Sequence, residues 1–288
     1  MEGGPRSIRA CAPVRILDLG GWTDTWFAEE GACLSLAVTP GVEATITTSP
    51  AAPGADPVYT ITAFGQTATT TRSAAEARKF EGEHVLIQAA LSLRLPPPGT
   101  DCVLTIASDC PPASSVGSSA SASVAVLGAL DRLAGAQRTR QEVAEAAFEV
   151  ESTVLGWQTG VQDQAAAAVG GVCWTHVDGY PKFTASALSL PGGLATTLEE
   201  CIVLVYLGRH CSSDVHTTVI KSCEELGRDF APLVELRRIA RGARAAPALL
   251  EALGGYMVES TAAQQALHCG LVGAQATAVF EAAKRRGA

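Results

Sequence analysis

A serine-rich turn that opens a strongly apolar helix constrains this chain more than any other feature. Residues 111–133 read PPASSVGSSASASVAVLGALDRL; two prolines and a glycine mark a turn, and residues typical of a buried helix follow from Ser118. Six serines lie between Ser114 and Ser123, although one capping hydroxyl suffices for a helix start. Such small side chains let another group approach the first helical amides, which attract an anion such as phosphate. The pattern also suits a tightly packed helix start with a redundant cap.

Composition and charge limit the class of protein. The chain has 288 residues, of which 47% are hydrophobic, and this predicts one large or two medium-sized domains with buried cores. The net charge is −8 and no run of lysine or arginine occurs, so neither nucleic acid nor an anionic membrane is an expected partner. No stretch has the apolar length of a membrane span, and no secretory signal is expected.

Cysteine and histidine usage predicts a reducing, cytoplasmic location. The nine cysteines are odd in number and form no C-x-x-C pair, and several lie within apolar runs, as reduced core cysteines do. The five histidines have no metal-ligand spacing.

The pattern of elements favours an α+β fold. Strands are predicted at residues 8–19, 32–38, 42–48, 58–62, 102–107, 172–177 and 202–207. Helices are predicted at 76–95 and 139–155, after the serine turn, and over most of the chain beyond 207. Residues 178–200 are rich in Gly, Pro, Ser and Thr, which indicates a domain boundary there. Strands and helices mix without strict alternation, as α+β proteins do.

Two acidic residues in the middle of the chain are candidate functional groups. Glu151 lies beside the apolar stripe of the predicted 139–155 helix, either as a boundary residue or as a carboxylate with a partner. Asp163 lies in GWQTGVQDQAAAAVGG, where small residues allow close backbone approach. Asp163 is therefore a candidate general base or metal ligand, and the alternative is a solvated turn residue.

The N-terminal segment CAPVRILDLGGWTDTW holds a second group of candidates. Arg15 lies in an apolar strand, and Gly20 to Asp24 follow as a Gly-Gly turn with an aromatic and an acidic residue. Trp22 and Asp24 can frame a sugar, with Trp22 as a wall and Asp24 as a hydroxyl acceptor. The alternative is a glycine turn with a capping Asp. Asp18 is given a structural role, and Arg209 and His210 are weaker candidates for the same cleft.

Together these segments resemble the GHMP kinases, a family of small-molecule kinases. PPASSVGSSAS resembles the family's second motif, P-x-x-x-G-L-G-S-S-A, and APVRILDLGGWTD resembles the first motif as it occurs in the branch that phosphorylates fucose or heptose 7-phosphate. VESTVLGWQTGVQDQAAAAVGG resembles a third signature of that branch, with Ala165 where tyrosine is common. The three segments occur in the right order over roughly 160 residues.

The resemblance implies roles for the matching residues. Asp163 is implied as the catalytic aspartate, with Arg15 as the basic residue beside it. Ser119 and Glu151 are the implied magnesium ligands, and Asp24, Trp22 and Gly21 the implied sugar-binding residues. The cradle for the ATP phosphates is implied at Ser115, Gly117, Ser118, Ser119 and Ala120.

The resemblance also implies a fold and a reaction. The expected fold is a two-domain α+β protein, with an ATP-binding, strand-rich domain at residues 1–190 and a ferredoxin-like domain at 191–288. The expected reaction is ATP- and Mg-dependent phosphorylation of a sugar or sugar phosphate at the anomeric hydroxyl; the alternative is a kinase relic that binds sugar or nucleotide without turnover. The family's glycine-rich third motif is not found after the last predicted helix. Either the chain is truncated or it lacks that motif. In both cases we expect a weak kinase that self-associates, for example as a homo-oligomer.

Overall fold

A mixed β-sheet organises the computed structural model, which describes residues 6–65, 69–71, 79–111, 113–190, 192–209, 213–246 and 249–287. In this part of the chain the sheet has seven strands in the order β4-β3-β5-β2-β6-β7, with β1 paired to β2 beside that path. The strands are β1 (Arg6–Leu19), β2 (Gly31–Pro50), β3 (Tyr59–Ala63), β4 (Thr69–Thr71), β5 (Thr100–Ser108), β6 (Val172–Gly179) and β7 (Lys182–Ala187). The sheet together with the helices confirms the α+β class.

Strand β2 is the long central strand of this sheet and pairs with β1, β5 and β6. Its first part, from Gly31 to Leu36, pairs with β6, and its second part, from Val42 to Pro50, pairs with β5. Strand β1 runs antiparallel along both parts and keeps them in one element. The two strands predicted at 32–38 and 42–48 are therefore a single strand.

The helices occupy two regions of the molecule. They are α1 (Val85–Leu93), α2 (Ser118–Ala134), α3 (Arg140–Glu149), α4 (Gln162–Val169), α5 (Leu194–Cys201), α6 (Ser213–Leu226), α7 (Ala231–Ala245), α8 (Leu249–Leu267) and α9 (Ala274–Lys284).

The predicted helix at 76–95 begins only at Val85, because Gly82 and His84 have left-handed backbone angles; its residues 76–78 lie outside the described ranges.

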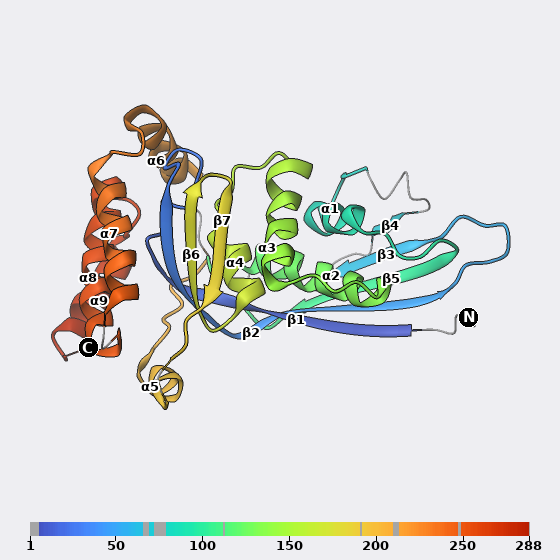
Figure 1. Cartoon of the computed structure of the whole chain (residues 1–288), viewed down its shortest axis with the longest axis horizontal. Helices are drawn as coiled ribbons and strands as arrows, with labels where there is room; N and C mark the ends of the chain where they lie inside the picture. Colours follow the sequence, from blue (N-terminus) through green and yellow to red (C-terminus); the bar gives the residue numbers. More distant parts are fainter. Residues whose placement is uncertain are drawn as a thin grey trace.

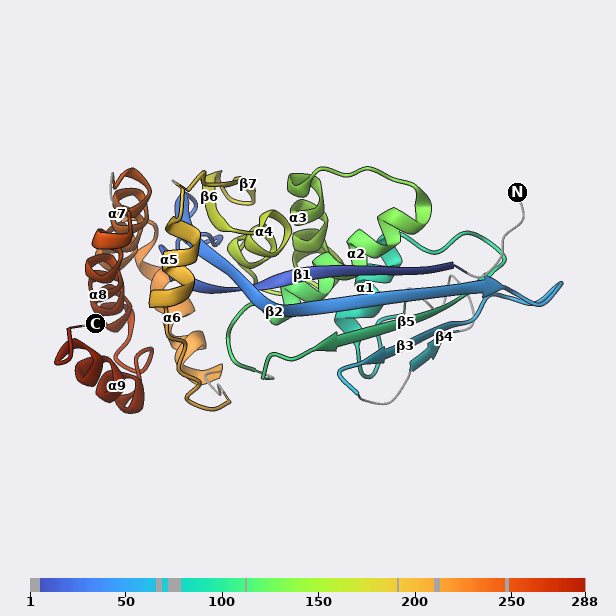
Figure 2. The same cartoon turned by 90° about the horizontal axis from the view of Figure 1, so that it is seen from below.

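Helices α1 to α4 cover the sheet, whereas α7 to α9 stack at the end opposite the N-terminal end of β1 (Figures 1 and 2). Leu233, Leu236 and Ile239 of α7 share one apolar cluster with Leu34 of β2 and Trp174 of β6. The apolar cores of the two predicted domains therefore meet. The division at residue 190 falls between β7 and α5 and stays a prediction.

The strand predicted at 202–207 does not form. This segment follows α5 without regular secondary structure and pairs with no strand in the described part of the protein. Its side chains are mostly in solvent: Val203 is 82% exposed and Leu204 66%. The predicted ferredoxin-like domain accordingly has helices but no strand of its own among the described residues. Exposed apolar chain without a strand partner favours association, so self-association stays a prediction with a physical basis.

No helix in the described ranges has both the length and the apolar character needed to cross a bilayer.

Candidate active site

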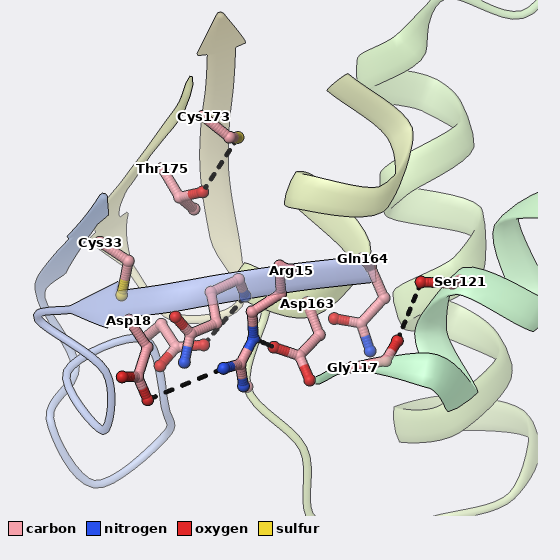
Figure 3. A network of polar contacts seen from close by, with 12 residues as sticks. Arg15, Asp18, Cys33, Gly117, Ser121, Asp163, Gln164, Cys173 and Thr175 are labelled. Carbon is pink, nitrogen blue, oxygen red and sulfur yellow. Dashed lines mark hydrogen bonds and ion pairs between the residues drawn. The ribbon is translucent and has the colours of Figure 1, made fainter. Parts of the chain in front are cut away.

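An ion pair between the first strand and a helix start forms the centre of the site. Asp163 lies in the first turn of α4, and its Oδ1 accepts a hydrogen bond from Nε of Arg15 at 2.7 Å (Figure 3). Arg15 Nη1 also lies 3.9 Å from Oδ2 of Asp18. Burial lowers the pKa of the Arg15 guanidinium, but the carboxylates of Asp163 and Asp18 outweigh this, and the net pKa lies above its ordinary value. Arg15 therefore remains a cation, and Asp163 is held by it rather than solvated in a turn.

The serine-rich turn packs directly on this ion pair. The backbone N–H of Arg15 donates to the carbonyl of Val116 at 2.9 Å, and the hydroxyl of Ser121 donates to the carbonyl of Pro13 at 2.7 Å. A Cβ atom at Gly117 would lie 3.1 Å from Oδ2 of Asp163, and the φ of Gly117 is +71°. Only glycine suits both conditions, so Gly117 brings the turn backbone against the carboxylate (Figure 3).

The backbone of the turn has the geometry of an anion cradle. Ala113, Ser115 and Gly117 have φ values of 56°, 58° and 71°, so left-handed residues alternate along it. Successive amides in such turns form a concave donor surface. Gly117 is the N-cap of α2, and no described side chain caps it. The helix start is tightly packed, since Ala120 to Ser123 are buried, but the redundant cap does not form. The first amides of this 17-residue helix therefore lie at its positive end without a side-chain cap.

Glu151 occupies a short π-helical turn, Val150–Val154, that continues α3. Its side chain is buried at 7% exposure, which argues against the solvent-boundary alternative. Oε2 accepts a hydrogen bond from the Thr159 hydroxyl at 2.9 Å, whereas Oε1 is buried without a hydrogen-bond partner among the described residues. Burial raises the pKa of Glu151, the Thr159 hydroxyl partly offsets this, and the charge of Asp163 raises it further. The two carboxylates are thus close enough to interact, and one buried Glu151 oxygen has no hydrogen-bond partner among the described residues.

The loop around Thr159 is held from two directions. Nε2 of Gln164 lies 3.4 Å from the Thr159 hydroxyl, and the Tyr180 hydroxyl donates to the Thr159 carbonyl at 3.0 Å. Tyr180 follows β6, so the β6–β7 turn fixes the loop that holds Glu151.

Asp24 caps the helix that carries Asp163. Its Oδ2 accepts hydrogen bonds from the backbone amides of Val161 and Gln162, at 2.8 and 2.9 Å. Burial raises the pKa of Asp24, and these two amides only partly offset it. The capping alternative is thus realised, but on a helix 137 residues away rather than on the local glycine turn.

A cavity of about 380 Å³ opens at this site, and we call it the polar cavity because charged side chains line it beside aromatic ones. Its described lining includes Arg15, Trp22, Asp24, Ser115 and Asp163, which brings together predicted residues from three sequence segments. Gly21 is not in the lining; it lies behind it, where a Cβ would stand 3.0 Å from Oδ2 of Asp18 and 3.2 Å from Nε2 of Gln162.

Several lining residues were not predicted. Trp22 meets His216 of α6 edge-on, with ring centroids 5.2 Å apart, and Gln264 of α8 also lines the cavity. Asp18, predicted as structural, is part of the lining, as is Gln162. The flanking position of Gln162 beside Asp163 was a usable signal, whereas nothing in the helical C-terminal sequence marks His216 or Gln264.

A second, mostly apolar cavity of about 570 Å³ lies on the other side of the serine turn. Val14 and Val38 line it from strands β1 and β2, Val116 from the serine turn, and Leu204 and Arg209 from the segment after α5. Ser115 lines both cavities, so the turn stands between them. Arg209 lies here rather than in the polar cavity, and His210 is outside the described residues.

Comparisons with known proteins identify a related family. Residues 83–171 match the GHMP kinases N terminal domain. Mevalonate kinase of Thermococcus sibiricus is 33% identical over 143 residues, which are 49% of this chain and 39% of that protein. The chain therefore aligns with well under two thirds of that relative.

Solved structures show the same fold. A D-glycero-D-manno-heptose 1-phosphate kinase from Bacteroides thetaiotaomicron superposes with a TM-score of 0.67 at 21% identity, covering 90% of this chain and 79% of that one. Mevalonate kinase of Methanococcus jannaschii superposes with a TM-score of 0.62 at 15% identity, covering 93% and 80%.

The resemblance to the GHMP kinases is confirmed: residues 83–171 match the N-terminal domain of these kinases, and the chain has their fold.

Proposed function

We propose that this protein is an ATP- and Mg-dependent kinase that phosphorylates a neutral sugar at its anomeric hydroxyl. The observation that carries the proposal is the Asp163–Arg15 ion pair, which lines the polar cavity and lies against the serine turn, with the apolar cavity on the other side of that turn. An acceptor in the polar cavity and a nucleoside in the apolar cavity would place the phosphates of ATP across the turn.

The charges of the polar cavity favour an uncharged acceptor. Apart from His216, the charged residues in its described lining are the cation Arg15 and three carboxylates, Asp18, Asp24 and Asp163. Partial burial raises the pKa of Asp18, whose side chain is 38% exposed, and the nearby Arg15 only partly offsets it. A carboxylate or second phosphate on the acceptor would add repulsion, whereas sugar hydroxyls can donate to these oxygens. This favours a sugar over mevalonate and over a sugar phosphate.

The residues at the turn fit a magnesium nucleotide. The Ser119 hydroxyl stands in the first turn of α2 and is exposed, and Glu151 offers its unpartnered oxygen. No group of three or more His, Cys, Asp or Glu in the described chain could hold a metal alone, so the phosphates of ATP would have to supply further ligands. Ser119 and Glu151 would hold the ion, which when bound neutralises charge on the phosphates.

The roles of the protein groups follow from their positions. Asp163 orients the anomeric hydroxyl and accepts its proton as the oxygen attacks the γ-phosphorus and ADP leaves. Arg15 keeps Asp163 in place through the 2.7 Å hydrogen bond. The amides of the turn stabilise charge on the phosphates without needing to reorganise.

ADP release with a panel of acceptors tests the proposal. The panel holds D-galactose, L-fucose, D-mannose and D-glucose, their 6-phosphates where these exist, and mevalonate, each with and without Mg²⁺. Release with a neutral sugar that requires Mg²⁺ is the expected result. Release with mevalonate alone would overturn the sugar assignment. Calorimetric binding of sugar or ATP without ADP release would favour the binding-protein alternative.

Glu151→Gln is expected to weaken the response to Mg²⁺ and to raise stability without metal. The pKa of Glu151 is higher in the folded chain than in the unfolded one, so the folded protein binds more protons between the two values. Its contribution to the free energy of unfolding therefore falls as pH rises through that interval, and Gln removes this loss. At pH 7 without metal we expect the Tm of the variant to rise by roughly 2–4 °C.

Thermal melting and a Mg²⁺ titration of ATP binding measure both effects, with Glu149→Gln on the exposed neighbouring residue as the control. A titration that Glu151→Gln leaves unchanged would make Glu151 a structural carboxylate and not a metal ligand.

A further inference from the structure

Gln162 is a buried amide at the wall of the polar cavity. It is the first residue of α4, its side chain is 8% exposed, and it lines the cavity beside Asp163. Its Oε1 is buried without a hydrogen-bond partner among the described residues. An unpaired buried acceptor is unfavourable, and in a cavity wall it indicates a missing donor on a ligand.

The surroundings of Gln162 hold its side chain in place. Its backbone amide donates to Asp24, which fixes the start of the helix. Gly21 leaves room for the amide, because a Cβ there would lie 3.2 Å from Nε2 of Gln162. The carboxamide is therefore packed against the first-motif turn, and its oxygen is the free end.

A comparison with Gln164 shows what is particular to Gln162. Gln164, two residues later in α4, also has a buried Oε1 without a described partner. Its Nε2, however, lies 3.4 Å from the Thr159 hydroxyl, and Gln164 is not among the residues that line the polar cavity. Gln164 supports the loop that holds Glu151, whereas Gln162 faces the acceptor side.

We propose that Gln162 determines acceptor specificity: its carboxamide oxygen accepts a hydrogen bond from a second sugar hydroxyl, beside the one that Asp163 contacts. This rests on the proposed sugar kinase function. A hydroxyl can supply the donor, whereas an ether, keto or carboxylate oxygen at that position cannot. Gln162 therefore selects acceptors that carry a hydroxyl at one position over their deoxy analogues. A site built to pair with a hydroxyl discriminates strongly against an analogue without it.

The test compares wild type, Gln162→Met and Gln162→Asn on D-galactose, L-fucose, D-mannose and D-glucose with their 2-deoxy, 3-deoxy and 4-deoxy analogues. Met has a size similar to Gln but has no acceptor oxygen. Asn keeps the carboxamide, but its side chain is one methylene shorter, so the oxygen lies farther from the cavity. Gln265→Met, on an exposed position of α8, is the matched control. Thermal melting verifies that each variant is folded.

Wild type is expected to lose about 10–100-fold in kcat/KM on one deoxy analogue of its best sugar. On the parent sugar, Gln162→Met should have a kcat/KM lower than that of wild type by a similar factor, mostly through a higher KM. On the deoxy analogue, its kcat/KM should be close to that of wild type. Gln265→Met should keep the wild-type discrimination. A folded Gln162→Met that discriminates as wild type does would overturn the proposal. If Gln162→Met fails to fold, the Asn variant carries the same comparison.

Calorimetric sugar binding separates this proposal from the proposed function. Sugar binding without ADP release would overturn the kinase activity. If Gln162→Met then weakened binding of the parent sugar but not of one deoxy analogue, the role of Gln162 would be supported. ADP release with wild-type discrimination in the variants would overturn Gln162 alone. Absence of binding and of turnover with every sugar would overturn both.

Discussion

Asp163→Asn is expected to lower turnover by two or more orders of magnitude while ATP binding stays nearly intact. Asn is close in shape but cannot accept the hydroxyl proton, and it gives Arg15 no charged partner at 2.7 Å. The loss is the typical scale for a positioned acid–base group. Steady-state ADP release gives kcat, and calorimetry with ATP reports binding.

Asp178→Asn is the matched control for this prediction. Asp178 is exposed, and its carboxylate pairs with His176 on β6 rather than with a residue of the cavity lining. Near-normal turnover in a folded Asp163→Asn protein would remove Asp163 from the mechanism.

Gly160→Ala is expected to damage both stability and activity, although it adds one methyl group. The new Cβ would lie 2.1 Å from Oδ2 of Asp24, the oxygen that caps α4. The carboxylate has to move, and the helix start that carries Gln162 and Asp163 moves with it. Loss of the cap should lower the free energy of unfolding by roughly 1–2 kcal/mol. A displacement of about 1 Å at the reacting group can lower kcat/KM by about 100-fold.

Denaturant unfolding and ADP release measure these effects. Gly192→Ala is the control, because no described atom lies within 4 Å of a Cβ at that exposed position. The double variant Asp24→Ala/Gly160→Ala should be little worse than Asp24→Ala, since the clash and the cap involve the same carboxylate. Additive losses would show that Gly160 acts by another route.

The sequence determined what depends on near neighbours along the chain. The serine turn and its helix, strand β1 and the sheet segment at β5 follow from turn residues, apolar periodicity and β-branched residues, and the structure forms them. Motif spacing was enough to select Asp163, Arg15 and Glu151 as candidates. Local order also explains a failure: Gly82 and His84 interrupt the predicted 76–95 helix through their backbone angles, which its apolar pattern does not reveal.

Only the tertiary structure decided what depends on partners far along the chain. Arg15 and Asp163 are 148 positions apart, and Asp24 caps a helix 137 positions away, so their contacts depend on how β1 and α4 pack. The same holds for the unpaired oxygens of Glu151 and Gln162, because burial and the absence of a donor are properties of a three-dimensional environment. The apolar segment at 202–207 has the composition of a strand, but a strand needs a neighbour for its backbone hydrogen bonds. None of the described strands pairs with it, and the segment stays irregular and exposed.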